Sequence, residues 1–200
     1  MNSDDHIDAS AALVSSHFAA AAQSATRQGD ALSRGIAKAA ERIVQTFLQN
    51  HKLVVFAPHH NRADGDSMVA RMLGQLEQAR PALPALRLNA PSLASEHAEG
   101  TSTAATEFQA LGNAGDVLLV FATGCQLPEL QSLSAVAQER AIEVIWFGPA
   151  RDESILSVRG EGDLVVWFDE QRIIRLLELQ RIAVHALADA IDSLLLGDGA

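Results

Sequence analysis

Five short runs of β-forming, largely apolar residues are the feature that most restricts the fold of this chain. They are Lys52–Ala57, Ala85–Leu88, Val117–Ala122, Glu143–Phe147 and Leu164–Phe168. Most are nearly continuous in apolar character, which suits strands that are buried on both faces. Helix-compatible segments separate most of them, roughly Asp64–Gln78, Thr101–Leu111 and Pro128–Arg140, and a final helix is expected from about Gln171 to Leu196. The alternation predicts an α/β fold with a five-stranded parallel sheet flanked by helices.

The N-terminal quarter has a helical pattern instead. From Ile7 to Gln49, small and branched apolar residues recur every three or four positions, and Gly29 interrupts the pattern. This predicts two helices with a break at Gly29. Their apolar content exceeds one narrow stripe, so residues 1–50 are expected to form oligomer contacts, while residues 51–200 form the α/β core of a single domain spanning 1–200.

Composition narrows the possible functions. The 200 residues are 48% hydrophobic, enough for one full core, and the formal net charge is −10 with no cluster of Lys or Arg. Direct binding to nucleic acid is therefore not expected. Cys125 is the single cysteine and excludes an internal disulfide, and no export signal or membrane span is evident. We expect a cytoplasmic protein that does not enter a membrane.

Two loops should carry any small-molecule site. In open α/β sheets, ligands bind beyond the carboxyl ends of the strands, where loops and helix N-termini present amide donors. The segment Ala57–Ser67 follows the first predicted strand, and Ala122–Leu127 follows the third.

The chain resembles the sugar isomerase (SIS) domain family over nearly its whole length, and three segments carry the resemblance. They are Glu77–Asn89, the Leu-Gly-x-x-Gly-Asp-Val-Leu-Leu run within Ala110–Leu119, and Ala190–Leu194. The resemblance is to the branch that contains phosphoheptose isomerase and a non-catalytic relative, the DnaA initiator-associating protein, and these segments are most similar to the latter. It implies a three-layer, flavodoxin-like sandwich and a homo-oligomer, expected to be a tetramer.

The same resemblance indicates a depleted phosphosugar site. The family's Gly-Asn-Gly-Gly-Ser loop is replaced by Pro58-His59-His60-Asn61, and in the second loop only Thr123 keeps a hydroxyl. Ser67, Arg71 and Leu177 fall where the isomerases have His, Glu and Gln for metal binding and acid-base catalysis, whereas the catalytic His falls on His185. We interpret Asn61, Thr123, Gly124 and Gln126 as the remnant of the phosphosugar site and His185 as the single catalytic candidate.

The side-chain chemistry of the histidines and aspartates near the first loop also allows other roles. His59 and His60, with His97 or His185, could bind a metal, but their spacing matches no common metal motif, so neither metal nor cofactor is expected. Asp64 and Asp66 could be catalytic, but helix capping explains them more simply. Each would oppose a phosphate charge at ~5 Å by roughly 3 kcal/mol.

Cys125 could be a nucleophile, but a small buried residue is favoured because no His partner is identifiable. Arg71 is expected to pair with Asp66 or Glu77.

The leading hypothesis is a non-catalytic scaffold that binds the replication initiator DnaA. The resemblance places a Leu-Phe pair that contacts DnaA on Leu195 and Leu196, and Asp189 and Asp192 are secondary candidates. A symmetric acidic oligomer could gather several basic partners. The rival hypotheses are an isomerase or sensor for sedoheptulose 7-phosphate, and a paralogue that forms mixed oligomers with an active isomerase.

Overall fold

The computed structural model describes residues 3–74, 79–89 and 103–197 and contains one parallel sheet. Its strands run in the spatial order β2-β1-β3-β4-β5, and every neighbouring pair is parallel. In chain order they are β1 (Leu53–Phe56), β2 (Ala85–Arg87), β3 (Val117–Phe121), β4 (Glu143–Pro149) and β5 (Leu164–Phe168). The predicted five-stranded parallel sheet is confirmed, with the bounds of β5 as predicted and those of the other four strands shifted by one or two residues at one or both ends.

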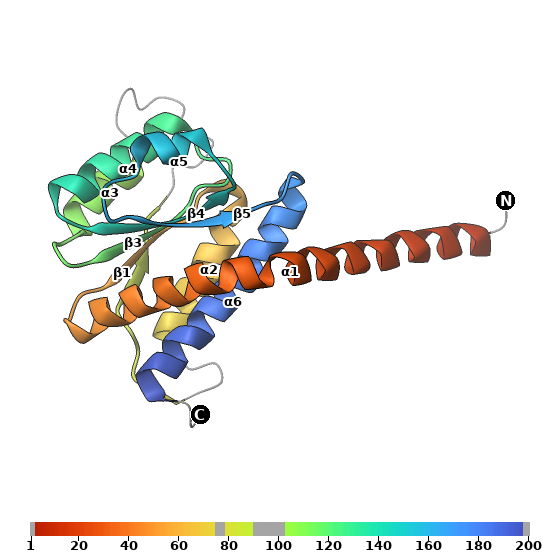
Figure 1. The fold of residues 1–200 in the computed structure, drawn as a ribbon, viewed down its shortest axis with the longest axis horizontal. Coiled ribbons are helices and arrows are strands. Elements are labelled where there is room, and N and C mark those ends of the chain that lie inside the picture. Colours follow the sequence, from red (N-terminus) through yellow and green to blue (C-terminus); the bar gives the residue numbers. More distant parts are fainter. Residues whose placement is uncertain (1–2, 75–78, 90–102, 198–200) are drawn as a thin grey trace.

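Helices cover both faces of the sheet, as Figure 1 shows. The helices α1 (Ser3–Leu48), α2 (Arg62–Leu73) and α6 (Ile173–Leu196) lie on one face, and α3 (Thr103–Leu111), α4 (Leu127–Glu139) and α5 (Glu153–Val158) lie on the other. Because side chains alternate along a strand, Leu53 and Val55 pack with α1, α2 and α6, whereas Val54 and Phe56 pack with α3 and α4. Two separate cores result, which is the expected three-layer sandwich.

The N-terminal segment is one helix, so the prediction of two helices broken at Gly29 is wrong. A helix-interior glycine costs only about 1 kcal/mol relative to alanine. Tertiary contacts on both sides of Gly29 outweigh this cost. Leu32 and Ile36 are each 7% exposed in the core, and the polar side chains Ser24 and Gln28 are also buried.

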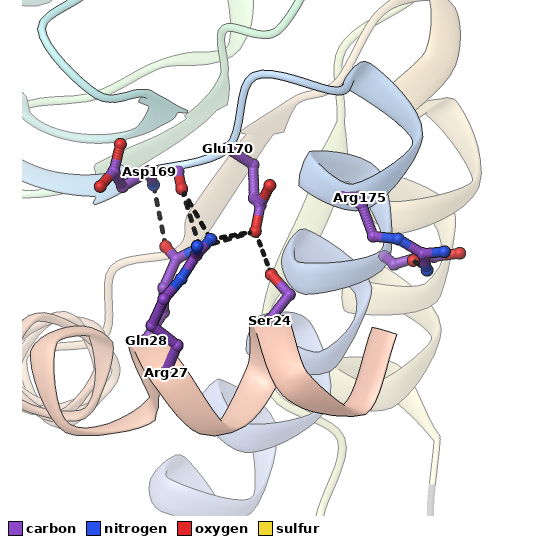
Figure 2. Close-up of polar contacts among 7 residues, drawn as sticks. Ser24, Arg27, Gln28, Asp169, Glu170 and Arg175 are labelled. Carbon is purple, nitrogen blue, oxygen red and sulfur yellow. Dashed lines mark hydrogen bonds and ion pairs between the residues drawn. The ribbon is translucent and has the colours of Figure 1, made fainter. Parts of the chain in front are cut away.

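Figure 2 shows the polar contacts that hold α1 to the turn before α6. The Gln28 side chain donates to the Asp169 carbonyl oxygen at 3.0 Å and accepts from the Asp169 backbone N–H at 2.8 Å. Glu170 accepts from the Ser24 hydroxyl and, at 2.5 Å, from Arg27 Nη2. N-terminal to these contacts, residues 6–19 have exposed side chains, although His17 Nε2 lies 2.7 Å from Glu178 Oε1 of α6. The N-terminal end of α1 extends beyond the rest of the molecule (Figure 1).

Helices α2 and α5 differ from the sequence prediction. Helix α2 begins at Arg62, after a 3-10 turn at His59–Asn61, and ends at Leu73 before Gly74; positions 75–78 of the prediction lie outside the described residues. The short helix α5 was not predicted, although Asp152 caps it by accepting from the N–H groups of Ser154 and Ile155.

Within the described ranges, no helix combines the length and apolar character needed to cross a membrane.

Candidate functional site

The site lies where the chain leaves β1 and β3 in opposite directions along the sheet. β1 leads through α2 to its neighbour β2, whereas β3 leads through α4 to β4 on the other side. The loops that follow β1 and β3 therefore diverge and leave a switch point at the carboxyl ends of these adjacent strands. The first loop places Asn61 at the start of α2, and the second forms a turn at Thr123 and Gly124.

A buried hydrogen-bond network joins the two loops through α6. Asn61 Nδ2 donates to Gln180 Oε1 at 2.7 Å, and Gln180 Nε2 donates to Thr123 Oγ1 at 3.1 Å. Asn61 and Gln180 are fully buried, and Thr123 is 4% exposed. The structure thus brings together two of the sequence-derived site residues, but through Gln180, which the sequence analysis missed. No donor among the described residues reaches the buried Asn61 Oδ1.

Asp64 forms the second part of the network. It is 3% exposed, accepts from Asn61 Nδ2 at 3.3 Å and forms an ion pair with Arg181 Nε at 2.5 Å. Burial raises the pKa of Asp64 above its ordinary value of 3.8, and the Arg181 charge, the Asn61 hydrogen bond and the His185 charge oppose this rise. Neither expected aspartate is a helix cap: Asp64 pairs with Arg181, and Asp66 pairs with Arg87 at 2.5 Å.

These ion pairs change the electrostatic argument made from the sequence. Each of the two carboxylates was expected to repel a phosphate group unopposed. In the folded chain, Arg181 and Arg87 bring a positive charge to each. The net charge of each carboxylate–guanidinium pair is therefore close to zero, and the repulsion estimated for a bare carboxylate does not apply.

In the second loop, Thr123 is the residue whose side chain joins the buried network. Gly124 has a φ of 80°, so its left-handed backbone favours glycine, and it is exposed, as is Gln126, which precedes α4 without a side-chain cap. The Cys125 thiol donates to the Phe121 carbonyl oxygen at 3.4 Å. Burial and the nearby Glu129 and Asp152 raise the pKa of Cys125, so the neutral thiol is favoured and a thiolate nucleophile is not.

The family model for the SIS domain matches residues 16–147, which is more than half of the chain. The chain belongs to the SIS domain family. It is 31% identical over 186 residues to the phosphoheptose isomerase of Thiobacillus denitrificans, covering 90% of this chain and 94% of that protein. It is 26% identical over 182 residues to the DnaA initiator-associating protein DiaA of Serratia proteamaculans, covering 89% and 93%. The expected family is confirmed.

Solved structures agree with the SIS fold. The structure of phosphoheptose isomerase GmhA from Neisseria gonorrhoeae superposes with a TM-score of 0.74 at 24% identity, covering 90% of this chain and 97% of that chain. This similarity supports the architecture. The chemistry depends on the residues at the switch point of this SIS domain.

Two positions where the resemblance led us to expect the isomerases' metal ligands, Ser67 and Arg71, do not offer ligands for a metal here. Arg71 Nη2 donates to Asp189 on α6 rather than pairing with Asp66, and the alternative partner Glu77 lies outside the described residues. A guanidinium at this position opposes a divalent cation. Among the residues that the structure describes, no three His, Cys, Asp or Glu side chains gather where they could hold a metal ion; His97 lies outside those residues.

The remaining site candidates lie on α6 and differ in exposure. His185 is exposed and close enough to Asp64 to affect its pKa. At the C-terminal end, Leu196 is 43% exposed, whereas Leu195 is half-buried and packs against the core. Asp192 pairs with Arg80 at 2.5 Å.

Proposed function

We propose that this chain is a non-catalytic SIS-domain protein that acts in the cytoplasm as a homo-oligomeric scaffold, expected to be a tetramer, with the replication initiator DnaA as its partner. The observation that carries the proposal is the closed network of Asn61, Gln180 and Thr123. Side chains that would contact a sugar phosphate bond to one another instead. A ligand would have to break these buried hydrogen bonds, at about 1 to 3 kcal/mol for each group left unsatisfied.

The choice of DnaA rests on the relatives. Several similar proteins, including that of Serratia proteamaculans, are named DnaA initiator-associating protein. Leu196 supports a contact at the end of α6, because its exposed side chain is free to enter a partner's pocket. Leu195 contributes to the core, so it is the weaker candidate for direct contact.

The test is a binding titration of the purified chain with DnaA, using Leu196→Asp and Leu156→Asp. These leucines are similarly exposed, at 43% and 46%, but Leu156 lies on α5, across the sheet from α6. We expect Leu196→Asp to abolish binding and Leu156→Asp to retain it. Equal binding by both variants would remove the α6 end as the contact, and no binding by the unmodified chain would end the DnaA proposal.

A second candidate is a sugar-phosphate isomerase or sensor, and the unpartnered Asn61 Oδ1 favours it. A ligand hydroxyl could donate to this oxygen, with the exposed His185 as the acid-base group. Sedoheptulose 7-phosphate is the substrate to test. At 100 times its dissociation constant, a ligand adds about 2.7 kcal/mol to the free energy of unfolding. We expect no stabilisation and no turnover; turnover that is lost in His185→Ala would replace the scaffold proposal.

The third hypothesis is a paralogue that forms mixed oligomers with an active isomerase. Such a chain would co-purify with that enzyme. Co-expression of this chain with a tagged phosphoheptose isomerase, followed by capture on the tag, separates this outcome from self-association.

A further inference from the structure

The loop that joins β1 to α2, residues 58–61, has a strained backbone. His59 has a φ of 51°, in the left-handed region that residues with a Cβ adopt only at an energetic cost. Its side chain is exposed, so burial of the imidazole does not explain this conformation. Contacts elsewhere in the loop must therefore hold His59 in place.

The contacts that hold the loop are made by Asn61. Its backbone N–H donates to the Pro58 carbonyl oxygen at 3.0 Å and closes the turn across His59. Its fully buried side chain donates from Nδ2 to Gln180 Oε1 at 2.7 Å and to Asp64 Oδ2 at 3.3 Å. Because the turn is closed across His59, the strain there cannot relax unless Asn61 leaves its buried position.

The anchor provided by Asn61 is itself incomplete. Its Oδ1 is buried, and no donor among the described residues reaches it. A buried acceptor without a donor loses its hydration and gains no hydrogen bond in return. The closed loop therefore carries two costs, the strain at His59 and the unsatisfied Asn61 Oδ1, and both would be relieved if the loop opened.

The same loop lies across the second loop of the switch point. His60 Cδ2 is 3.8 Å from the position that a Cβ on Gly124 would take. Burial raises the pKa of the Glu129 carboxyl, and the charge of His59 and a hydrogen bond from Cys125 oppose this rise. The imidazole of His59 thus lies near the first turn of α4, and the loop spans the region that holds Cys125.

We propose that residues 58–61 form a lid over the switch point, which opens when His59 leaves the left-handed region and Asn61 withdraws from the buried network. Opening breaks the hydrogen bonds of Asn61 Nδ2 but relieves both costs of the closed loop. Each of these contributions is comparable to the net stabilisation by one hydrogen bond. The lid therefore opens without global unfolding, and it exposes Gln180 and Thr123 to a ligand of the switch point.

The body of α2 has separate anchors that keep it in place while the lid moves. Asp64 pairs with Arg181 Nε of α6, and Asp66 pairs with Arg87 Nε of β2, both at 2.5 Å. The motion is thus confined to the loop before the helix. It is a property of the isolated chain and requires neither DnaA nor a sugar phosphate.

The first test uses the thiol of Cys125 as a reporter of lid opening, through its rate of reaction with N-ethylmaleimide. His59→Gly and His59→Ala both lack the imidazole and differ only in the Cβ that is strained at positive φ. Ala141 is the matched control, since it has a φ of 53° but precedes β4 at the opposite end of the strands. Ala141→Gly therefore makes the same change from alanine to glycine at a distant site.

We expect His59→Gly to react about 5-fold more slowly than His59→Ala, a ratio that corresponds to about 1 kcal/mol. Ala141→Gly should react like the unmodified chain, although urea denaturation should show a similar gain in stability from glycine at both positions. Equal rates for His59→Gly and His59→Ala overturn the proposal. Equal slowing at both positions also overturns it, because the thiol would then react only after global unfolding.

The second test follows the lid directly by hydrogen exchange of the Asn61 backbone N–H. This N–H should exchange faster than that of Leu119, which is fully buried in β3, and about 5-fold more slowly in His59→Gly than in His59→Ala. Exchange of Asn61 as slow as that of Leu119 would show that the loop opens only with the whole fold. Neither test involves a partner or ligand, so failure here is distinct from failure of the proposed function.

Discussion

Gln180 decides the character of the site at the scale of single residues. Gln180 lies between Leu179 and Arg181 in α6, with no recognisable motif around it. Its position allows it to reach both loops, where it accepts from Asn61 and donates to Thr123. The signal present in the sequence is that Leu176, Ala183 and Val184 stand three or four positions from this glutamine, and a glutamine on an apolar helix face needs polar partners.

Replacing Gln180 tests how much this network stabilises the fold. Gln180→Ala leaves the Asn61 amide and the Thr123 hydroxyl without this partner and creates a cavity, so we expect the free energy of unfolding to fall by about 3 kcal/mol. Urea denaturation measures the change. Gln49→Ala, at an exposed position, should change it by less than about 0.5 kcal/mol. Equal effects of the two substitutions would show that the network contributes nothing.

The raised pKa of Asp64 predicts a pH dependence of stability. Because burial raises the pKa in the folded state above the ordinary 3.8, the folded chain binds this proton more readily than the unfolded chain. The Asp64 contribution to the free energy of unfolding therefore decreases as pH rises from about 3.8 through the raised value. Asp64→Asn does not titrate, so it should gain stability relative to the unmodified chain over that interval.

Chemical denaturation at several pH values between about 4 and 7 measures this difference. Asp30→Asn, which removes an exposed acid from α1, serves as the control for a change in net charge. A difference between Asp64→Asn and the unmodified chain that stays constant with pH would contradict the assignment.

At the scale of elements, α1 shows how tertiary contacts override a local break signal. The helix passes through Gly29 because Gln28 and Leu32, on either side, are fixed by Asp169 and by the core. Gly35 in the same helix differs, since a Cβ there would lie 3.2 Å from Val166 Cγ2. The two glycines therefore differ: an added side chain would meet open space at Gly29 and close packing on β5 at Gly35.

A pair of alanine substitutions tests this contrast. Gly29→Ala should raise the free energy of unfolding by about 0.5 to 1 kcal/mol through helix propensity alone, because its methyl group meets no atom within 4 Å. Gly35→Ala should gain less or lose stability, because its methyl group must displace Val166. Thermal denaturation of the two variants provides the comparison, and equal gains would refute the steric reason for Gly35.

At the scale of the whole molecule, self-association should make thermal stability depend on concentration. If folded chains associate through α1 and unfolded chains do not, the Tm of the unmodified chain rises with protein concentration. Phe18 is 70% exposed on α1, so Phe18→Asp should lose this contact and have a Tm that is independent of concentration, while Leu156→Asp, on α5 across the sheet, should follow the unmodified chain. Differential scanning calorimetry over a wide concentration range measures this, and parallel behaviour of the two variants would exclude the α1 contact.

Strand and helix prediction succeeded where burial on both faces left a clear pattern. β1 and β3 are entirely buried, so their apolar runs are unambiguous. α5 was missed because six residues are too few to show a period, and only the capping Asp152 marked it. The site was predicted in part. Asn61 and Thr123 follow strand ends, but Gln180, which joins them, and Arg181, which pairs with Asp64, lie more than fifty residues further along the chain.

The amino-acid sequence alone determined the layered α/β architecture, because apolar periodicity is a local property that records which face of each element is buried. Through the resemblance to the SIS family, it also carried the expectation that Ser67 and Arg71 stand where the isomerases have metal-binding side chains. Only the tertiary structure decided that α1 is continuous, that Asp64 is paired with Arg181 and that Gln180 closes the network. These outcomes depend on contacts between distant segments, whose geometry exists only once the sheet has aligned them.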